Sequence, residues 1–218
     1  SPTSSAPPRA PARDAGAVSD GQVHVVAMDV AREEDVLAAF EFVDGCDGIL
    51  RGLVNNAGIL DRQTRLDAMS AARIKRIFEV NTLSAFLCAR EAVRRMSTRH
   101  GGSGGSIVNV SSRAAVLGSP NEYIDYAASK GALDTLTIGL SKEVGGEGIR
   151  VNGVRPGLIH TEMHASGGEP GRVDRLKSGV PLGRGGEPEE IAEAVLWLMS
   201  EKAAYCTGTL VDVTGGRM

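Results

Sequence analysis

The stretch Tyr126-Ala127-Ala128-Ser129-Lys130 limits what this chain can fold into more than any other, because it opens a long helical pattern. In a helix, residues four apart share a face, so the Tyr126 hydroxyl and the Lys130 ammonium meet on one side. A free phenol has a pKa near ~10, and bringing it towards ~7 needs roughly 4 kcal/mol. A cation at about 4 Å supplies up to about that much at an effective dielectric constant of ~20. The pair therefore predicts acid–base chemistry on an alcohol or a carbonyl.

Alone, a Tyr and a Lys at this spacing are more often an interfacial aromatic ring and a solvated charge. The residues before them favour the chemical interpretation. The apolar run Ile107–Val110 predicts a buried parallel strand, and it leads directly into Ser111-Ser112. A strand, a loop and a helix in this order bring a hydroxyl, a phenol and an ammonium to the C-terminal edge of a sheet. Open α/β sheets bind their ligands at that edge.

Composition narrows the class of protein. With 218 residues, 42% of them hydrophobic, the chain has enough apolar material for the core of one domain. A net charge of −3 and few aromatic residues argue against a nucleic-acid partner. No apolar run approaches the ~18 residues of a membrane span, so no membrane partner is expected. The three cysteines, Cys46, Cys88 and Cys206, lie far apart and show neither disulfide nor zinc-site spacing. We therefore expect a cytoplasmic protein in which the cysteines are small buried hydrophobic residues.

The chain divides into a tail and a domain. Residues 1–21 are rich in Ser, Pro, Ala and Arg without an apolar period, which predicts a low-complexity tail outside the fold. From residue 22 onwards strands and helices alternate. Strands are predicted at 23–28, 53–54, 106–110, 150–154 and 209–213, and helices at 33–43, 70–98, 123–144 and 187–199. This alternation predicts a single Rossmann-like α/β domain at 22–218 with a doubly wound parallel sheet.

Two polar features interrupt this pattern. Asn55-Asn56-Ala57-Gly58 follows a predicted strand, and its small residues allow a backbone to approach a flat ligand; an ordinary turn is the alternative. Asn81 lies inside the predicted helix 70–98, where propensity disfavours it. Either its amide is solvated, or it interrupts the helix and holds a water molecule.

Two further motifs carry less weight. The glycine-rich run 100–105 precedes a strand, whereas a dinucleotide fingerprint follows a strand and opens a helix, so we interpret the run as a flexible connection. His160, Glu162 and His164 resemble metal ligands only faintly, because no helix is predicted to align them, and no metal site is expected. They lie in a loop-like segment of about thirty residues, a length typical of a lid over a binding site.

The order of these motifs resembles the short-chain dehydrogenase/reductase family. The match begins near Gln22 and runs to the C-terminus, and within the family the segments 123–132 and 164–168 look like bacterial 3-oxoacyl-carrier-protein reductase-like or glucose 1-dehydrogenase-like oxidoreductases. A single such motif would be weak, but six in the family's order are specific. They are Asp29, Asn55-Asn56-Ala57-Gly58, Asn81, Ser112, Tyr126-x-x-x-Lys130 and Pro156-Gly157-x-x-x-Thr161.

The resemblance implies a carbonyl–alcohol oxidoreductase that uses NADP, with NAD as the alternative. Tyr126 would be the general acid/base, and Lys130 would lower its pKa and bind the nicotinamide ribose. Ser112 would hydrogen-bond the substrate oxygen, and Asn81 would hold a water molecule in a proton relay. Fourteen positions separate Ser112 from Tyr126 where thirteen is commoner in the family, so Ser111 stays a minor alternative. Tyr123 has no Lys four residues later and is not expected to be catalytic.

The resemblance also implies contacts with the cofactor along three segments. Asp29 and Val30 would contact adenine, and the residues after the next strand would contact the adenosine side. The nicotinamide amide and the pyrophosphate would lie against the segment after the 150–154 strand, and residues 160–182 would close over the substrate. The complete set is Asp29, Val30, Asn56, Ala57, Gly58, Tyr126, Lys130, Pro156, Gly157, Ile159 and Thr161.

The chain departs from the family at its front. Family members begin with a strand, a glycine-rich turn and a helix, and nothing before Gln22 resembles them. The resemblance implies the sheet order 3-2-1-4-5-6-7, so we expect an incomplete Rossmann fold with 53–54 as an exposed apolar edge. A second hypothesis follows, in which the chain is a truncated, inactive remnant that acts at most as an interaction subunit.

The family also implies homo-oligomers, either dimers or tetramers. We expect apolar stripes on two helices to form the contact between subunits. The alternative is that these stripes pack only against the core of their own subunit. The stripes contain Ile77, Val80, Phe86 and Leu87 on one helix and Leu133, Leu136, Ile138 and Leu140 on the other.

Overall fold

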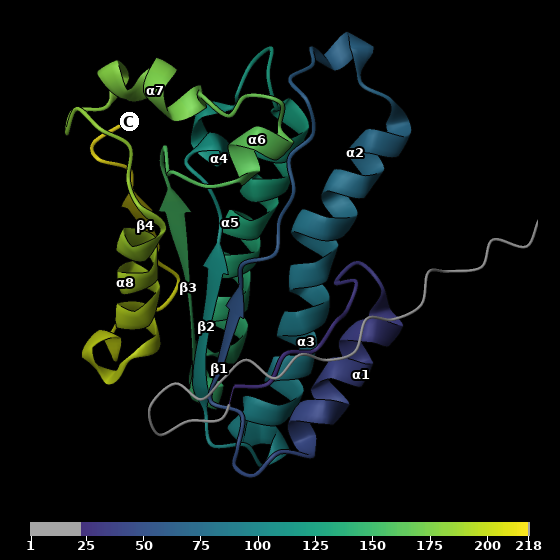
Figure 1. Cartoon of the computed structure of the whole chain (residues 1–218). Coiled ribbons are helices and arrows are strands. Elements are labelled where there is room, and N and C mark those ends of the chain that lie inside the picture. Colours follow the sequence, from purple (N-terminus) through teal and green to yellow (C-terminus); the bar gives the residue numbers. More distant parts are fainter. Residues whose placement is uncertain (1–22, 218) are drawn as a thin grey trace, which may run out of the picture.

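The computed structural model describes residues 23–217, in which parallel strands form one sheet between two layers of helices (Figure 1). The strands follow one another across the sheet in chain order, β1-β2-β3-β4, and every neighbouring pair is parallel. This is the predicted Rossmann-like α/β fold. The strands are β1 (Gly52–Asn55), β2 (Gly105–Val110), β3 (Ile149–Pro156) and β4 (Leu210–Val213).

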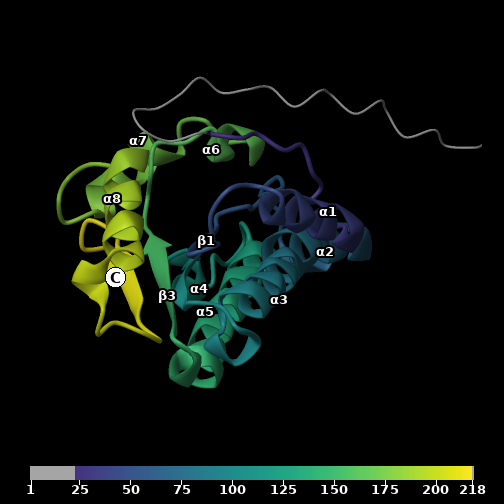
Figure 2. The same ribbon diagram turned by 90° about the horizontal axis from the view of Figure 1, so that it is seen from below.

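The helices lie on both faces of this sheet. α1 (Glu33–Asp44), α3 (Ser84–Met96) and α5 (Ile124–Val144) cover one face, and α8 (Pro188–Met199) covers the other (Figures 1 and 2). α2 precedes α3 and packs against α5. The remaining helices are α2 (Ala71–Phe78), α4 (Ala114–Leu117), α6 (Met163–Ser166) and α7 (Arg172–Leu176). Short 3-10 turns occupy Leu66–Ala68, Thr98–His100, Gly145–Glu147, Lys177–Gly179 and Glu201–Ala203.

The core has two halves because side chains alternate along the central strands. Ile107 and Val151 pack with α1, α3 and α5, whereas Val108 and Val154 pack with α8. Fully burying one such side chain stabilises the fold by about 1.5–3 kcal/mol. The sheet is therefore fixed from both faces at β2 and β3, which hold the C-terminal edge in place.

The strand predicted at 23–28 does not form. Val23, Val25 and Val26 are at least 40% exposed, and no residue among 23–217 forms a ladder with this segment. A β-strand satisfies its backbone groups only through a neighbouring strand, so an apolar run without one stays irregular. β1 is the edge strand of the described sheet, as expected, and Val54 on it is 42% exposed. The predictions for residues 1–21 fall outside the described residues.

The helix predicted at 70–98 is interrupted. α2 ends at Phe78, a π-helical turn runs over Glu79–Leu83, and α3 follows. Asn81 lies in the middle of this turn with its side chain buried, so the solvated alternative is wrong and the interruption is confirmed. Single π-turns inside helices occur often at functional sites.

The other predicted elements form with small changes in their ends. β3 is longer than predicted, and the segment after it contains α6 and α7 instead of loop alone. α8 begins with Pro188 and a capping box, in which the Glu187 and Glu190 side chains each bond the other's backbone amide. Such a box satisfies amides that a helix start leaves unpaired.

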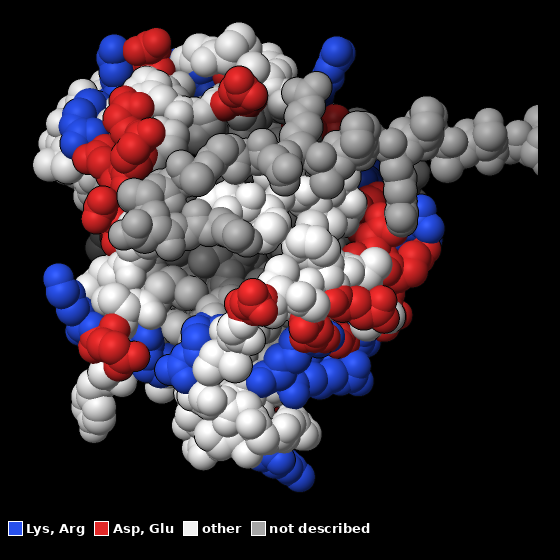
Figure 3. Space-filling view, turned by 60° about the horizontal axis from the view of Figure 1, so that its bottom comes forward, with Lys and Arg blue, Asp and Glu red and all other residues white. Residues whose placement is uncertain are grey.

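The surface mixes both signs of charge. Figure 3 shows basic and acidic side chains interleaved on one face of the molecule. Ion pairs such as Arg90–Glu33 and Arg95–Asp44 join α3 to α1. Within the described part of the chain, no helix has the length and apolarity needed to cross a membrane.

Candidate active site

A large cavity lies where the C-terminal ends of β2 and β3 meet the start of α5. Its volume is about 1060 Å³, and its walls combine the sheet edge, α4, α8 and the segment from 158 to 172. Parallel strands bring their carboxyl ends to one edge, which is where open α/β sheets bind ligands. Most of the predicted site residues line it: Asn56, Ala57, Gly58, Ser112, Tyr126, Lys130, Pro156, Gly157, Ile159 and Thr161.

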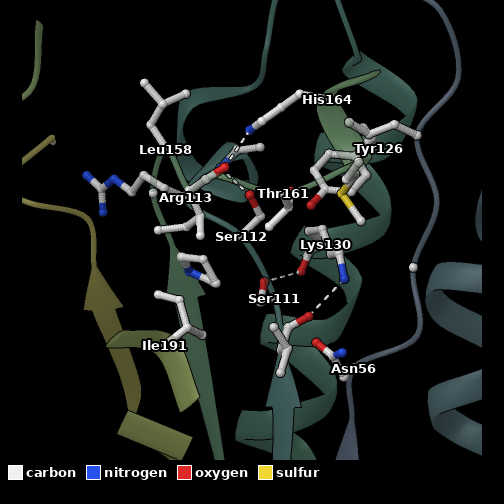
Figure 4. A pocket seen from close by; sticks show the side chains of 18 of the residues that line it. Asn56, Ser111, Ser112, Arg113, Tyr126, Lys130, Leu158, Thr161, His164 and Ile191 are labelled. Carbon is white, nitrogen blue, oxygen red and sulfur yellow. Dashed lines mark hydrogen bonds between the residues drawn. The ribbon is translucent and has the colours of Figure 1, made fainter. Parts of the chain in front are cut away.

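Tyr126 and Ser112 form the centre of this site. Both side chains line the cavity (Figure 4), and the Ser112 hydroxyl acts on the Tyr126 phenol by lowering its pKa. The Ser112 Oγ accepts a hydrogen bond from the Ala114 amide at 3.1 Å, which fixes its orientation.

A buried ion pair secures the start of α5, the helix that carries Tyr126. Arg73 donates to both Asp125 carboxylate oxygens at 2.7 and 3.2 Å.

Lys130 is buried one helical turn further along α5. Its Nζ donates to the Val110 carbonyl at 2.8 Å and lies 5.7 Å from the centre of the Tyr126 ring. Burial lowers the pKa of Lys130 to about 8, opposed by the negative charge of Asp134. An ammonium this close to neutrality can take part in proton transfer near physiological pH.

The structure does not show the expected lowering of the Tyr126 pKa by Lys130. Burial raises the pKa of the Tyr126 phenol, and the Ser112 hydroxyl offsets this rise only in part. Lys130 contributes no lowering, because its ammonium bonds the Val110 carbonyl and not the phenol. The sequence places the two residues on one helix face, but the side-chain direction of Lys130 is set by β2.

Ser111 and Ser112 face different partners. The Ser111 side chain is buried and its Oγ donates to the Lys130 carbonyl at 3.0 Å, which ties β2 to α5 (Figure 4). Ser112, the residue with the less common spacing, lines the cavity with Tyr126 and lowers the pKa of its phenol. The geometry therefore favours Ser112 over Ser111 for contact with a substrate oxygen.

Asn81 reaches the site from the π-turn. Its Oδ1 accepts from the Ile59 amide at 2.7 Å, and its Nδ2 donates to the Ile59 carbonyl and to Ser129 Oγ at 3.0 and 3.1 Å. Gly58 separates it from the ammonium, since a Cβ there would lie 3.3 Å from Lys130 Nζ and 3.6 Å from Asn81 Oδ1. Asn81 and Lys130 thus approach each other across Gly58, where a side chain would crowd the ammonium.

Asp29 and Val30 lie apart from the main cavity. Val30 lines a second, apolar cavity of about 240 Å³, shared with Asn56, Ala57 and Asn81. The Asp29 carboxylate accepts from the Ala31 amide at 3.0 Å and pairs with Arg76 at 3.5 Å. Asn56 and Ala57 line both cavities, so they connect the two parts of the predicted cofactor surface.

The segment over the cavity is tied to the start of α5. The Tyr123 hydroxyl donates to the Gly167 carbonyl at 3.2 Å, and the Arg172 guanidinium lies 5.0 Å above the Tyr123 ring. Arg172 also pairs with Glu122 and with Glu169. Tyr123 therefore anchors the predicted lid, a role that its sequence position alone did not indicate.

His160 and His164 separate in the structure. His164 Nε2 faces the Ile159 carbonyl at 2.9 Å, and burial lowers the pKa of its ring, so it is a neutral lining residue of the cavity. His160 lies 4.0 Å from Glu187 on the side of α8. Over residues 23–217, no cluster of three or more His, Cys, Asp or Glu side chains is arranged to hold a metal ion.

The donor set fits the nicotinamide end of a dinucleotide. An ammonium carries three donors, and the described structure uses one Lys130 donor on Val110, which leaves donors for ribose hydroxyls. Gly157 packs so tightly that a Cβ would lie 2.7 Å from Thr214 Cα, which keeps the backbone at the sheet edge bare. Thr161 adds a hydroxyl on the same wall.

A Rossmann-like sheet with a serine, a tyrosine and a lysine at its C-terminal edge defines an oxidoreductase of the nicotinamide-dependent class. The chain belongs to the short-chain dehydrogenase/reductase family. A family model described as enoyl-(acyl carrier protein) reductase matches residues 7–217, which extends the resemblance upstream of Gln22. The chain is an enzyme of this type by its relatives as well as by its fold.

Three relatives illustrate the similarity. The uncharacterized oxidoreductase YgfF of Escherichia coli K12 is 58% identical over 197 residues, covering 90% of this chain and 80% of that protein. A gluconate 5-dehydrogenase from Burkholderia cenocepacia, solved with NADP and tartrate, superposes with a TM-score of 0.79 at 33% identity, covering 87% of this chain and 73% of that one. A structure described as ribose-5-phosphate isomerase from Brucella melitensis gives a TM-score of 0.80 at 31% identity, covering 87% and 72%.

Proposed function

We propose that this chain interconverts a carbonyl compound and a secondary alcohol by hydride transfer, with NADP as cofactor and NAD as the alternative. The observation that carries the proposal is that Ser112, Tyr126 and the buried Lys130 line one cavity at the C-terminal edge of the sheet. Relatives named carbonyl reductase family member 4, from Danio rerio, and 3-oxoacyl-[acyl-carrier-protein] reductase, from Aquifex aeolicus, support this reaction class.

Each residue of the set has a distinct role in this proposal. The nicotinamide supplies or accepts the hydride at the reacting carbon. The Ser112 hydroxyl binds the substrate oxygen, and the Tyr126 phenol donates a proton to that oxygen in reduction and removes it in oxidation. Lys130 binds the nicotinamide ribose and passes protons, with Asn81 holding a water molecule beside Gly58. Burial raises the pKa of Tyr126, which keeps the phenol protonated at neutral pH and suits reduction of a carbonyl.

The cofactor would lie along the C-terminal edge of the sheet. Asp29 and Val30 would contact the adenine, and the Asn56-Ala57-Gly58 backbone the adenosine side. The nicotinamide half would lie on the wall formed by Pro156, Gly157, Ile159 and Thr161. We favour NADP because the gluconate 5-dehydrogenase neighbour was solved with it.

The proposal includes a cytoplasmic homo-oligomer acting on a small-molecule substrate. α3 and α5 keep apolar side chains on their outer faces, including Phe86 and Ile138, which pack only partly into this subunit. Part of each predicted stripe, in contrast, belongs to the core, as Leu87 and Leu133 show. The exposed part is the surface that we expect to meet a second copy.

A fluorescence titration with NADPH, and in parallel with NADH, tests the cofactor proposal directly. We expect saturable binding at about micromolar concentrations, tighter for NADPH. A screen of ketones, aldehydes and secondary alcohols then identifies the substrate, with Tyr126→Phe as the control for chemistry. Absence of binding up to about 1 mM would contradict the proposal and favour the inactive-remnant hypothesis.

A further inference from the structure

A buried ion pair lies one helical turn beyond Lys130. Asp134 follows Lys130 by four residues on α5, so both side chains emerge from the same face of the helix. Arg155, near the end of β3, donates to Asp134 Oδ2 through Nε at 2.9 Å and through Nη2 at 2.8 Å. Asp134 is buried, and its second oxygen, Oδ1, has no hydrogen-bond partner among the described residues. The carboxylate is thus neither solvated nor fully paired.

The pair continues as a line of alternating charges toward Ser112. Arg155 Nη1 lies 4.0 Å from Asp212 Oδ1 on β4, and Arg113 Nη1 lies 3.0 Å from Asp212 Oδ2. Arg113 directly follows Ser112, lines the main cavity, and donates its backbone amide to the Pro156 carbonyl at 2.9 Å. The line therefore begins one helical turn beyond Lys130 and ends beside Ser112.

The other groups that the described part of the chain is seen to place beside Lys130 carry no charge at neutral pH. They are the Val110 carbonyl from β2, Gly58 and the Asn81 amide from the segment after β1 and the π-turn, and the Tyr126 phenol from α5. Of the charged groups in the line, Asp134 is the one that acts on Lys130, and it opposes the lowering of the Lys130 pKa by burial. Arg155, Asp212 and Arg113 stand further along.

We propose that Asp134 and Arg155 are positioning residues that set how much of Lys130 is protonated in the active site. Asp134 holds the proton on the buried ammonium, and Arg155 limits that effect by neutralising part of the carboxylate. The inference deepens the proposed function, because it concerns the group that would bind the ribose and pass protons. Buried carboxylates near a lysine favour its charged form, whereas a buried cation nearby disfavours it.

This role predicts the direction in which each substitution shifts the pKa of Lys130, whereas a purely structural role of the ion pair does not. If the pair only held α5 against β3, removing either partner would loosen the same contact, and both variants would change Lys130 in the same way. If the charges act on Lys130, the two variants must act in opposite directions. Asp134→Asn lowers the pKa of Lys130, and Arg155→Gln raises it.

The pKa of Lys130 can be measured without substrate or cofactor. The chain contains five lysines, of which Lys130 is buried and the other four are exposed: Lys75, Lys142, Lys177 and Lys202. Protein labelled with 13C at the lysine ε-carbon gives five signals, and Lys130→Met identifies the one that belongs to Lys130. A pH titration of that signal should give a midpoint at about 8 in the parent protein.

We expect the midpoint to fall by about half a unit or more in Asp134→Asn and to rise by a similar amount in Arg155→Gln. Glu91→Gln is the matched control, since Glu91 is an equally buried acid paired with arginines, on α3 and away from Lys130. It should leave the Lys130 midpoint in place. An unchanged midpoint in either test variant, or shifts of the same sign in both, would overturn the proposal.

Circular dichroism first establishes that each variant is folded. If a single variant fails to fold, the double variant Asp134→Asn with Arg155→Gln removes both charges and leaves none unpaired, a change that buried pairs often tolerate. Because Asp134 acts on Lys130 directly and Arg155 acts through Asp134, the double variant should lower the midpoint by less than about half a unit. An unchanged midpoint there would also overturn the proposal, whereas failure of NADPH to bind would affect only the proposed function.

Discussion

The centre of the sheet is sealed on both faces, whereas the β1 edge and the segment before α1 leave apolar side chains in solvent. Val151 on β3 is fully buried between the two helix layers, while Val25 is 44% exposed and Val54 on β1 is 42% exposed. All three residues are valines, and all come from runs of strand-forming sequence. Their exposure differs because Val151 has paired strands and helix layers around it, whereas Val25 has no paired strand in the described part of the chain and Val54 lies on an edge strand.

This difference has a functional side. We call β2, β3 and the helices packed on them the sealed half of the molecule. The cavity with Ser112, Tyr126 and Lys130 lies on this half, where β2, β3 and α5 pack against one another. The adenine side of the predicted cofactor surface, with Asp29 and Val30, lies on the exposed half. The proposed catalytic residues therefore lie on the buried part of the sheet, and the proposed cofactor surface extends over both parts.

Tyr126→Phe should have the largest effect. Removing the phenol from the sealed half should lower kcat by about 10²–10⁴-fold, because proton transfer to the substrate oxygen is lost. Affinity for NADPH should change by less than about threefold, because the hydroxyl is one contact among many. Steady-state kinetics and a fluorescence titration measure the two quantities on one protein sample. Retention of kcat within tenfold would move the catalytic role elsewhere.

Val151→Ala and Val25→Ala form a matched pair that tests the comparison itself. In the sealed half the substitution should lower the free energy of unfolding by about 2–3 kcal/mol, from lost burial and a new cavity. In the exposed segment it should change it by less than about 0.5 kcal/mol. Urea denaturation followed by circular dichroism gives both values. Equal losses would mean that residues 23–28 are packed in solution.

The sequence predicted the sealed half well, because there local pattern and packing agree. The strands at β2 and β3 and the helices α5 and α8 form where apolar periodicity placed them, within a few residues. The strand at 23–28 failed because hydrophobic pattern reports what a backbone favours and not whether a partner strand is present. Asn81 illustrates an intermediate case, in which propensity left a solvated amide and an interruption open and did not predict the π-turn that resulted.

The site shows the same division between position and direction. Spacing alone predicted that Tyr126 and Lys130 share a face and that Ser112 stands at the sheet edge. It did not predict that Lys130 bonds Val110, because that contact depends on how β2 ends against α5. Asp134 could have been found, since it repeats the four-residue spacing after Lys130, but its partner Arg155 comes from another strand.

Asn81→Ala should weaken the connection between the segment after β1 and the sealed half. The Asn81 side chain bonds both main-chain groups of Ile59 in the segment that follows β1, and Ser129 on α5. Leaving those buried groups unpaired should cost about 2 kcal/mol of unfolding free energy and speed hydrogen exchange at the Ile59 amide. Asn152→Ala is the control, because Asn152 makes similar buried bonds to the Cys206 and Thr209 main chain. It should cost a similar amount and leave exchange at Ile59 unchanged; faster exchange in both variants would refute a local tie.

Lys130→Met should have the smallest effect on stability and the opposite sign. A lysine whose pKa is lowered from 10.5 to about 8 on folding destabilises the protein below pH 8, because its charged form loses solvation. As pH rises from about 8 towards 10.5, the folded chain releases this proton while the unfolded chain keeps it, so stability rises over that window. Methionine removes the cost and also the bond to Val110, which leaves a gain of about 1–2 kcal/mol at pH 7.

The gain from Lys130→Met should therefore disappear as pH approaches 10.5, and urea denaturation at both pH values measures it. Lys142→Met, an exposed lysine on the same helix, is the control and should change stability by less than about 0.5 kcal/mol at either pH. A loss of stability at pH 7 in Lys130→Met would mean that the ammonium is well paired in solution. A gain would show that the sealed half retains a destabilising charge at the position where the proposed chemistry requires one.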